Sequence, residues 1–399
     1  MNGAFVAISY SLPERTVSYL RKFFRTLLLI FILFISWPFI EKQLEKTDFY
    51  PVLENTKSKI NAMKENPHVL AAIDTIYQNI FEFAGKLDSA GELLQQNQDQ
   101  LEKKQVKKPN LATPADQVFS IHNIEIGDKK EEVESQVGSA KRSSYNEYGT
   151  EWQTYHENYQ NFLMVAYDEK NHVAGLYTNQ DLIASVNGLK RGSPKDAVLQ
   201  NLGKPLTRIL KGMTFFQFQE NRDYDVFLLD DSYVTIFYDK HENNTVTAIQ
   251  IINKQLEQNK KDFYTQASDQ LKEGFEYQLF DLTNADRVNH HLPILKWNDQ
   301  VKETARKHSD DMAEHNYFSH TNLVGQSPFD RMGDDHISFT AAGENLATGQ
   351  FSSIFAHEGL MNSLGHRENI LRSEYQFLGV GVAFNTTSQP YYTENFFKQ

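Results

Sequence analysis

Three motifs in the last third of the chain hold the residues best suited to chemistry. They read F-S-H-T-N at residues 318–322, G-E-N-L-A at 343–347 and N-S-x-G-H-R-x-N-I-L at 362–371. Neutral imidazoles are good zinc ligands, and a carboxylate can complete such a site or orient its histidines. The same side chains can also form a structural network, in which His320 and Glu344 bond across a cleft and Asn345 ties a loop to the backbone. Both interpretations stay open.

Several other catalytic patterns are excluded by spacing. The chain has no G-x-S-x-G elbow, and His357-Glu358 does not begin H-E-x-x-H because Met361 occupies the fifth position. Residues 343–349 look like a phosphate loop, but their glycines are one residue too far apart and no Lys-Ser/Thr follows. The chain contains no cysteine, which excludes disulfide frameworks, thiolate zinc sites, cysteine nucleophiles and iron–sulfur clusters.

The elements that must position these motifs can be predicted from apolar spacing. A helix is expected over about 275–291, followed by Pro293, and a second helix is expected to be capped by Asp299. His308 lies in the apolar stripe of this second helix, so we expect a hydrogen-bonded core histidine there and not a ligand. Two strands, 378–384 and 391–397, are expected to close the chain.

The three motifs, in this order and spacing, resemble those of the CAP superfamily, which joins cysteine-rich secretory proteins, insect venom antigens and plant pathogenesis-related proteins. The resemblance covers roughly residues 265–399 and is nearest to the cysteine-free bacterial branch. With the region ahead of it, the chain resembles membrane-anchored CAP proteins of Bacillus type that carry a CAP-associated module. The resemblance implies an α-β-α sandwich with a central cleft.

Many members of this family carry a cleft tetrad of two histidines and two acids, whose histidines can hold a divalent metal. His320 matches the first histidine, Glu344 the acid of the G-E-N motif, and His366 the second histidine. The fourth position departs from the pattern, because this chain has Leu360-Met-Asn-Ser363 where many relatives have a glutamate. Glu358, on the same predicted helix, is the candidate substitute. The resemblance thus predicts zinc or another divalent cation on His320, His366 and Glu344, and a ligand-binding cleft lined by Asn345, Glu358, Ser363 and Arg367.

The preferred function is ligand binding at the cell envelope, with a small or extended ligand or a protein partner in this cleft. No residue has a catalytic role in that interpretation. One alternative is an envelope hydrolase, a peptidase or cell-wall enzyme, in which Glu344 acts as general base with His320 and His366. Another is an interaction domain with an inert cleft.

Residues 26–40 form an uncharged apolar run that follows the basic residues Arg21, Lys22 and Arg25. With Phe23 and Phe24 included, the run approaches the length of a membrane span. The basic flank predicts an uncleaved single-pass anchor with its N-terminus inside and the rest of the chain extracellular. A cleaved signal peptide and a buried core helix are the competing interpretations. The chain after residue 40 carries a net charge of −15, which argues against nucleic-acid partners.

Between residues 69 and 101, apolar residues recur at alternating spacings of four and three, as in a coiled-coil seam. The seam is either a homo-oligomerising stalk or a helix that packs on its own chain. The polar, proline-containing residues 103–114 are expected to be a linker.

The middle of the chain repeats itself. Gly127 precedes Gly138 by eleven residues, and Gly192 precedes Gly203 by the same interval. Amphipathic stretches lie between the paired glycines, and strand-like runs follow at 162–167 and 226–238. This predicts two tandem copies of a helix-plus-antiparallel-sheet module, suited to binding or packing against a neighbour.

The predicted fold class is therefore α+β. The predicted segments are a basic cytoplasmic segment (1–25), a transmembrane anchor (26–40), a helical stalk and linker (41–114), a duplicated module (115–258) and a CAP domain with an α-β-α sandwich (263–399).

Overall fold

The glycine spacing of the middle region corresponds to two short helices with matching ends. In the computed structural model, which describes residues 106–399, these are α5 (Lys130–Val137) and α6 (Lys195–Leu202). Gly138 and Gly203 follow their last residues with φ of 79° and 78°. Glycine adopts such positive φ values without the steric cost that a Cβ imposes. The predicted duplication is confirmed. The predicted anchor and stalk lie outside the described residues.

Each copy continues into antiparallel strands. The first copy contains β1 (Phe119–Ile121), β2 (Arg142–Tyr145), β3 (Glu151–Glu157), β4 (Gln160–Tyr167), β5 (Val173–Thr178) and β6 (Ile183–Ser185). The second contains β7 (Arg208–Lys211), β8 (Thr214–Gln217), β9 (Tyr224–Leu229), β10 (Ser232–Asp239), the 3-10 turn η1 (Lys240–Glu242), β11 (Thr245–Asn253) and α7 (Lys254–Asn259).

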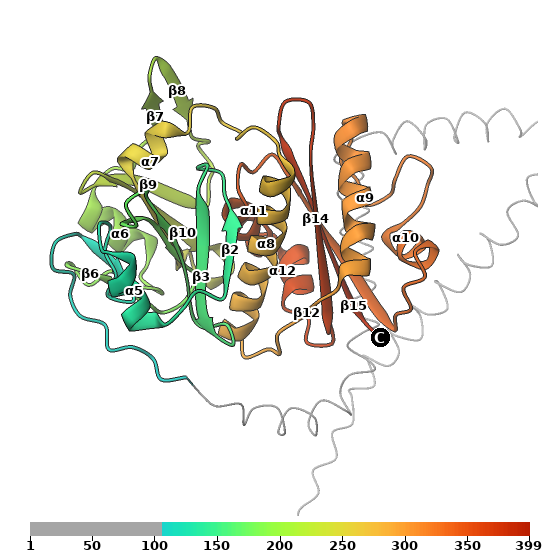
Figure 1. Cartoon of the computed structure of the whole chain (residues 1–399), viewed down its shortest axis with the longest axis horizontal. Helices are drawn as coiled ribbons and strands as arrows, with labels where there is room; N and C mark the ends of the chain where they lie inside the picture. Colours follow the sequence, from blue (N-terminus) through green and yellow to red (C-terminus); the bar gives the residue numbers. More distant parts are fainter. Residues whose placement is uncertain (1–105) are drawn as a thin grey trace, which may run out of the picture. The chain divides into compact units, whose positions relative to one another are not determined.

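The two copies form one sheet. Its strand order is β2-β3-β4-β5-β11-β10-β9, so the copies join through β5 and β11, the last main strand of each. These two strands pair antiparallel, with Leu176 opposite Ile251. One face of the sheet is covered by the two short helices, whose Val133 and Val198 are fully buried. In Figure 1 the β7–β8 hairpin extends beyond this sheet.

The C-terminal region is a second α+β layer structure. Its elements are α8 (Asp269–Asn289), β12 (Lys296–Trp297), α9 (Asp299–His315), α10 (Pro328–Asp334), β13 (Ala341–Thr348), α11 (Ser353–Met361), α12 (Leu364–Ile370), β14 (Phe377–Phe384) and β15 (Pro390–Lys398). The sheet order is β12-β14-β15-β13. The two closing strands were predicted, and the structure confirms them. The cap of α9 differs from the prediction, because Asn298 accepts from the Val301 amide and Asp299 is already the first helical residue.

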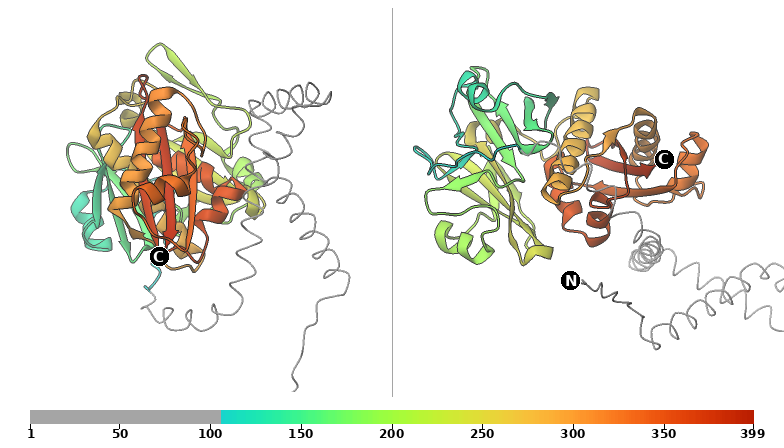
Figure 2. Two further views of the ribbon diagram at one scale, coloured as in Figure 1. Left: turned by 90° about the vertical axis from the view of Figure 1, so that its right-hand side faces the viewer. Right: turned by 90° about the horizontal axis from the view of Figure 1, so that it is seen from below.

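Alternating residues of β14 explain how helices cover both faces of this sheet. Leu378, Val380 and Val382 are buried in the cluster that includes α8. Gly379 and Gly381 point to the other face, where a Cβ on Gly381 would lie 2.1 Å from the backbone nitrogen of Arg306 in α9. The glycines therefore let the α9 backbone approach the sheet closely (Figures 1 and 2). The result is the predicted α-β-α sandwich.

The duplicated module and the sandwich share one hydrophobic core. The face of the seven-stranded sheet that lies opposite α5 and α6 contributes aromatic residues such as Trp152 and Phe162. Helices α8 and α11 contribute Phe275, Leu279 and Ile354 to the same cluster. The backbones also approach closely, because a Cβ on Gly274 of α8 would lie 2.0 Å from the Tyr145 carbonyl oxygen. The middle module therefore packs against its neighbour, as one of its two predicted roles requires.

No helix within residues 106–399 combines the length and the apolar composition that a bilayer crossing needs.

Candidate functional site

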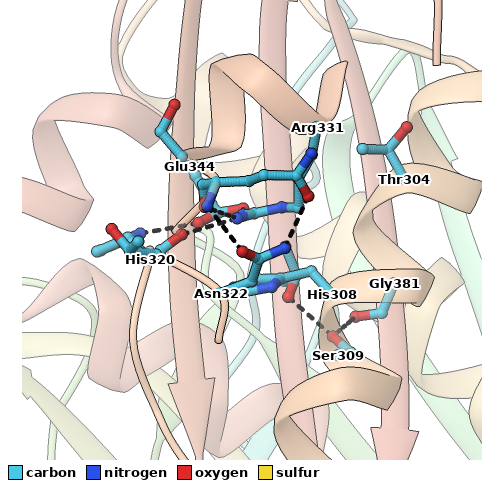
Figure 3. Close-up of polar contacts among 12 residues, drawn as sticks. Thr304, His308, Ser309, His320, Asn322, Arg331, Glu344 and Gly381 are labelled. Carbon is cyan, nitrogen blue, oxygen red and sulfur yellow. Dashed lines mark hydrogen bonds and ion pairs between the residues drawn. The ribbon is translucent and has the colours of Figure 1, made fainter. Parts of the chain in front are cut away.

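Glu344 and His320 lie together, as the motifs predict. Glu344 is in β13 and is 3% exposed, and His320 is in the loop between α9 and α10. Nδ1 of His320 donates a 2.9 Å hydrogen bond to one oxygen of the Glu344 carboxylate. Arg331 of α10 donates a 2.7 Å hydrogen bond from Nη2 to the other oxygen (Figure 3). The Glu344 carboxylate thus accepts hydrogen bonds from two sides, from the His320 imidazole and from the Arg331 guanidinium.

Arg331 also fixes the loop that carries His320. Helix α10 begins with Pro328 after a capping box, in which Ser327 and Asp330 bond reciprocally. This well-defined start directs Arg331 inward, where Nη1 donates to the carbonyl oxygens of His320 at 2.8 Å and Gln326 at 3.1 Å. One guanidinium therefore positions both the histidine backbone and the carboxylate to which the histidine bonds.

The electrostatics of Glu344 follow from these contacts. Burial would raise its pKa, but the hydrogen bond from His320 and the positive charge of Arg331 outweigh burial, so the pKa of Glu344 is lowered from its usual value. Glu344 is therefore ionised at neutral pH and acts as a fixed hydrogen-bond acceptor.

His366 lies on α12, and its surroundings keep it uncharged. Burial and the nearby His320 lower the pKa of His366 to about 4. Asn345, next to Glu344 in β13, donates from Nδ2 to the His366 carbonyl oxygen at 3.2 Å and to a Glu394 oxygen at 3.0 Å. Asn369 donates to the Asn345 side chain at 3.0 Å. Asn345 is fully buried, so it braces α12 against β13 beneath the histidines.

The predicted three-ligand metal site does not fit this geometry. Both oxygens of Glu344 are engaged by His320 and Arg331. Within the part of the chain that the structure describes, no group of three or more histidine, aspartate or glutamate side chains could hold a metal ion. Zinc sites normally use three or four protein ligands. Glu344 is placed to orient His320, a role that carboxylates have behind metal-bound histidines.

Two residues predicted to line the cleft lie elsewhere. Glu358 of α11 is directed at the duplicated module and accepts a 2.6 Å hydrogen bond from the Tyr177 hydroxyl of β5. Arg367 of α12 pairs with Asp239 of the same module at 2.8 Å. Ser363 stands at the N-cap of α12 without a side-chain capping bond. Glu358 and Arg367 thus belong to the interface with the middle module, and Glu358 does not replace the missing fourth acid.

Arg331 has a larger role than the sequence indicates. In the sequence, an arginine shortly after a Ser-Pro pair looks like a solvent-facing residue, yet only 8% of its surface is exposed. The buried pair of Asp286 and His357, joined at 2.7 Å, was also missed. Burial lowers the pKa of His357, but its bond to Asp286 outweighs burial and raises the pKa. Glu344 is 13 residues from Arg331 and His357 is 71 residues from Asp286, so neither contact follows the spacing of a single helix or strand.

The comparisons with known proteins agree with this architecture. Residues 126–263 match the family described as CAP-associated N-terminal, and residues 280–396 match the cysteine-rich secretory protein family, CAP. The chain is 45% identical over 124 residues to "Uncharacterized membrane protein YlbC" and 40% identical over 108 residues to "Uncharacterized protein YkwD", both of Bacillus subtilis (strain 168). These matches cover 31% and 27% of this chain. The matched segments span 34% and 42% of those relatives, so they cover well under half of each.

A solved structure extends the similarity to both regions. It is an extracellular protein containing an SCP domain from Bacillus anthracis str. Ames, 26% identical, with a TM-score of 0.60. The match covers 75% of this chain and 99% of that one. The chain therefore carries a CAP domain behind a CAP-associated N-terminal domain, in a cysteine-free form.

Proposed function

We propose that this chain displays its CAP domain outside the cell, tethered through residues 26–40, and that the cleft around His320, Glu344 and His366 binds an envelope ligand or protein partner. Two similar proteins, one named as a membrane protein and the other as an extracellular protein, support the location. The basic flank at residues 21–25 supports an inside N-terminus.

The observation that carries the binding role is the fixed pair of His320 and Glu344. The pair is oriented by Arg331 and lies near the uncharged His366. Preorganised polar groups of this kind give a ligand its orientation at little entropic cost.

Binding is better supported than hydrolysis. A general base works best when its pKa is near the working pH and when it can reach a water molecule. The pKa of Glu344 is instead lowered, and both of its oxygens already accept hydrogen bonds. No step of the proposed function passes through a metal ion.

The test compares the full chain with a His320→Ala/Glu344→Gln/His366→Ala variant in co-sedimentation with envelopes isolated from the source cells. The variant is expected to lose most of its binding, and His315→Ala, at an exposed position on α9, is expected to keep it. Equal binding by all three proteins would favour the inert cleft and contradict the proposal. Calorimetric titration of the full chain with zinc tests the metal prediction, and heat that is lost in a His320→Ala/His366→Ala variant would support it. Hydrolysis of cell-wall material that Glu344→Gln abolishes would favour the enzyme.

A further inference from the structure

The β7–β8 hairpin carries an exposed apolar surface that the proposed function does not use. Its strands form a separate two-stranded sheet, which projects beyond the seven-stranded sheet and α7 in Figure 1. Leu210 of β7 lies opposite Phe215 of β8, and Met213 lies in the turn between the strands. These three side chains, the hairpin tip, are 49%, 53% and 97% exposed. Single exposed apolar side chains are common, but a cluster of them on one projecting element marks a site of interaction.

The other face of the hairpin fixes it to the rest of the domain. Strand alternation places Ile209 on this face, where it is buried in a cluster with Val226 and Tyr233. Lys211 lies on the same face and pairs with Glu257 of α7. The hairpin tip is therefore presented by an element that is already held in place, so a contact through it requires little further ordering of the chain.

Basic side chains accompany the hairpin tip. The guanidinium carbon of Arg208 lies 4.1 Å from the centre of the Phe215 ring. Residues 197–219 contain three basic side chains, Lys204, Arg208 and Lys211, and no acidic one. Lys211 is paired with Glu257, whereas Lys204 and Arg208 are exposed. An apolar surface flanked by basic side chains suits the interface of an anionic bilayer, because apolar burial and charge attraction add there.

The net charge of −12 does not prevent such a contact. Charges are screened over about 8 Å at physiological ionic strength, so a bilayer at the hairpin tip responds to the nearest side chains and not to the whole chain. A second copy of the chain is a poorer partner for the tip. A two-fold contact brings the same patch of both copies together, which places the two Arg208 side chains near each other.

The predicted anchor keeps the hairpin close to a bilayer. Residues 41–105 separate the apolar run at 26–40 from the described part of the chain. At ~3.3 Å per residue, this segment spans at most about 210 Å. The hairpin tip therefore meets the bilayer at a high local concentration, and a weak contact is enough to hold it there.

We propose that the hairpin tip inserts into the surface of an anionic lipid bilayer, with Leu210, Met213 and Phe215 at the boundary between headgroups and acyl chains. Arg208 lies along this apolar surface while its charged end stays among the anionic headgroups. The contact is a second attachment of the chain to the membrane, and it turns one fixed side of the CAP-associated domain towards the bilayer. This orientation rests on the anchor of the proposed function.

The experiment uses a single introduced cysteine, because the chain has none of its own. Thr214→Cys, at the start of β8, is labelled with the polarity-sensitive dye nitrobenzoxadiazole. The labelled full chain is reconstituted into vesicles of phosphatidylcholine and phosphatidylglycerol in equal parts, with and without brominated acyl chains. We expect the dye emission to shift to shorter wavelengths and to be quenched by the bromine. Labelled Lys296→Cys, in β12 at the opposite end of the molecule in Figure 1, is expected to show neither effect.

Three variants of the chain labelled at position 214 test the residues. Leu210→Ser/Phe215→Ser removes apolar side chains from exposed positions, so the fold is retained, and most of the quenching is expected to be lost. Arg208→Gln is expected to reduce the quenching to the weaker level that we expect with phosphatidylcholine alone. Leu364→Ser, at an exposed leucine of α12, is the matched control and is expected to leave the quenching unchanged.

Flotation of the vesicles separates this proposal from the anchor. A chain that floats with the vesicles but shows no quenching at position 214 would overturn the insertion of the hairpin and leave the anchor intact. A chain that does not float contradicts both. Quenching that is equal with and without phosphatidylglycerol, or that is unchanged in Leu210→Ser/Phe215→Ser, also overturns the proposal. Energy transfer between labels on two chains without quenching by bromine would assign the hairpin tip to a second copy.

Discussion

The Glu358 carboxylate of the CAP domain accepts a 2.6 Å hydrogen bond from the Tyr177 hydroxyl of the CAP-associated domain. Both residues are buried, and the bond joins positions 181 residues apart. Burial, together with the negative charge of Asp286, raises the pKa of Glu358 to about 7. An acid that ionises near neutral pH therefore lies in the interface between the two domains.

This acid makes the stability of the chain depend on pH. The pKa of Glu358 is higher in the folded chain than its unfolded value of 4.5, so the protonated acid favours the folded state. This contribution of Glu358 to stability is complete below pH 4.5 and is lost as the pH rises through about 7. Glu358→Gln should therefore stabilise the chain more at pH 8 than at pH 5, by up to about 3 kcal/mol. Urea unfolding of the full chain at both pH values measures this difference. An equal effect at the two pH values would contradict the assignment.

The glycines of β14 that face α9 predict that adding one methyl group there strongly lowers the stability of the chain. Gly381→Ala places a Cβ 2.1 Å from the Arg306 nitrogen and forces α9 away from the sheet. We expect a loss of about 3 kcal/mol or more, because such overpacking involves the backbone. Gly359→Ala in α11 is the matched control, because its Cβ would lie 3.9 Å from the Gln350 side chain, an ordinary contact distance, and because alanine favours helix. Thermal unfolding should show a lower midpoint for the first variant only.

The ion pair of Arg331 and Glu344 should contribute more than pairs at the surface. Arg331→Gln leaves the buried carboxylate without its charged partner, and we expect a cost of about 3–5 kcal/mol. Lys141→Gln removes an exposed pair with Glu157 and should cost at most about 1 kcal/mol. Chemical unfolding of both variants compares them directly, and similar costs would show that Arg331 does not hold the site together.

The shared core predicts that the CAP domain is not stable alone. A fragment of residues 260–399 would expose Phe280 and Phe355. In the whole chain the ring of Phe280 packs against Tyr159, and the ring of Phe355 packs against Tyr224 and Phe237, all in the CAP-associated domain. We expect this fragment to aggregate or to bind a hydrophobic dye, whereas residues 106–399 should remain monodisperse. Light scattering and dye fluorescence measure the difference. A well-folded short fragment would contradict the shared core.

The absence of cysteine gives a direct test of the proposed topology. Thr386→Cys lies in the exposed turn between β14 and β15, and Ser11→Cys precedes the apolar run. A membrane-impermeant maleimide should label Cys at 386 in intact cells and Cys at 11 only after permeabilisation. Labelling of neither or of both in intact cells would contradict an inside N-terminus with an outside CAP domain.

Local sequence patterns predicted what depends on local geometry. The paired glycines end α5 and α6 because positive φ is a property of one residue and its neighbours. The motifs predicted that His320 and Glu344 lie together, because both residues match positions of the family pattern, and the structure shows them in contact. The directions of Glu358 and Arg367 were not predictable, because their partners Tyr177 and Asp239 lie on a different domain. The role of Arg331 was not predictable either, because a guanidinium bonded to three residues, two in the α9–α10 loop and one in β13, leaves no spacing signal.

The joining of β5 to β11 has a consequence for the order in which a newly made chain can fold. A chain that emerges N-terminus first presents β2 to β5 before β11, at residues 245–253, exists to pair with β5. The aromatic face of that sheet stays uncovered until α8 follows at Asp269–Asn289 and α11 at Ser353–Met361. A chain that folds from its N-terminus therefore passes through an incomplete sheet with an exposed aromatic face, and that face is the segment a chaperone would bind.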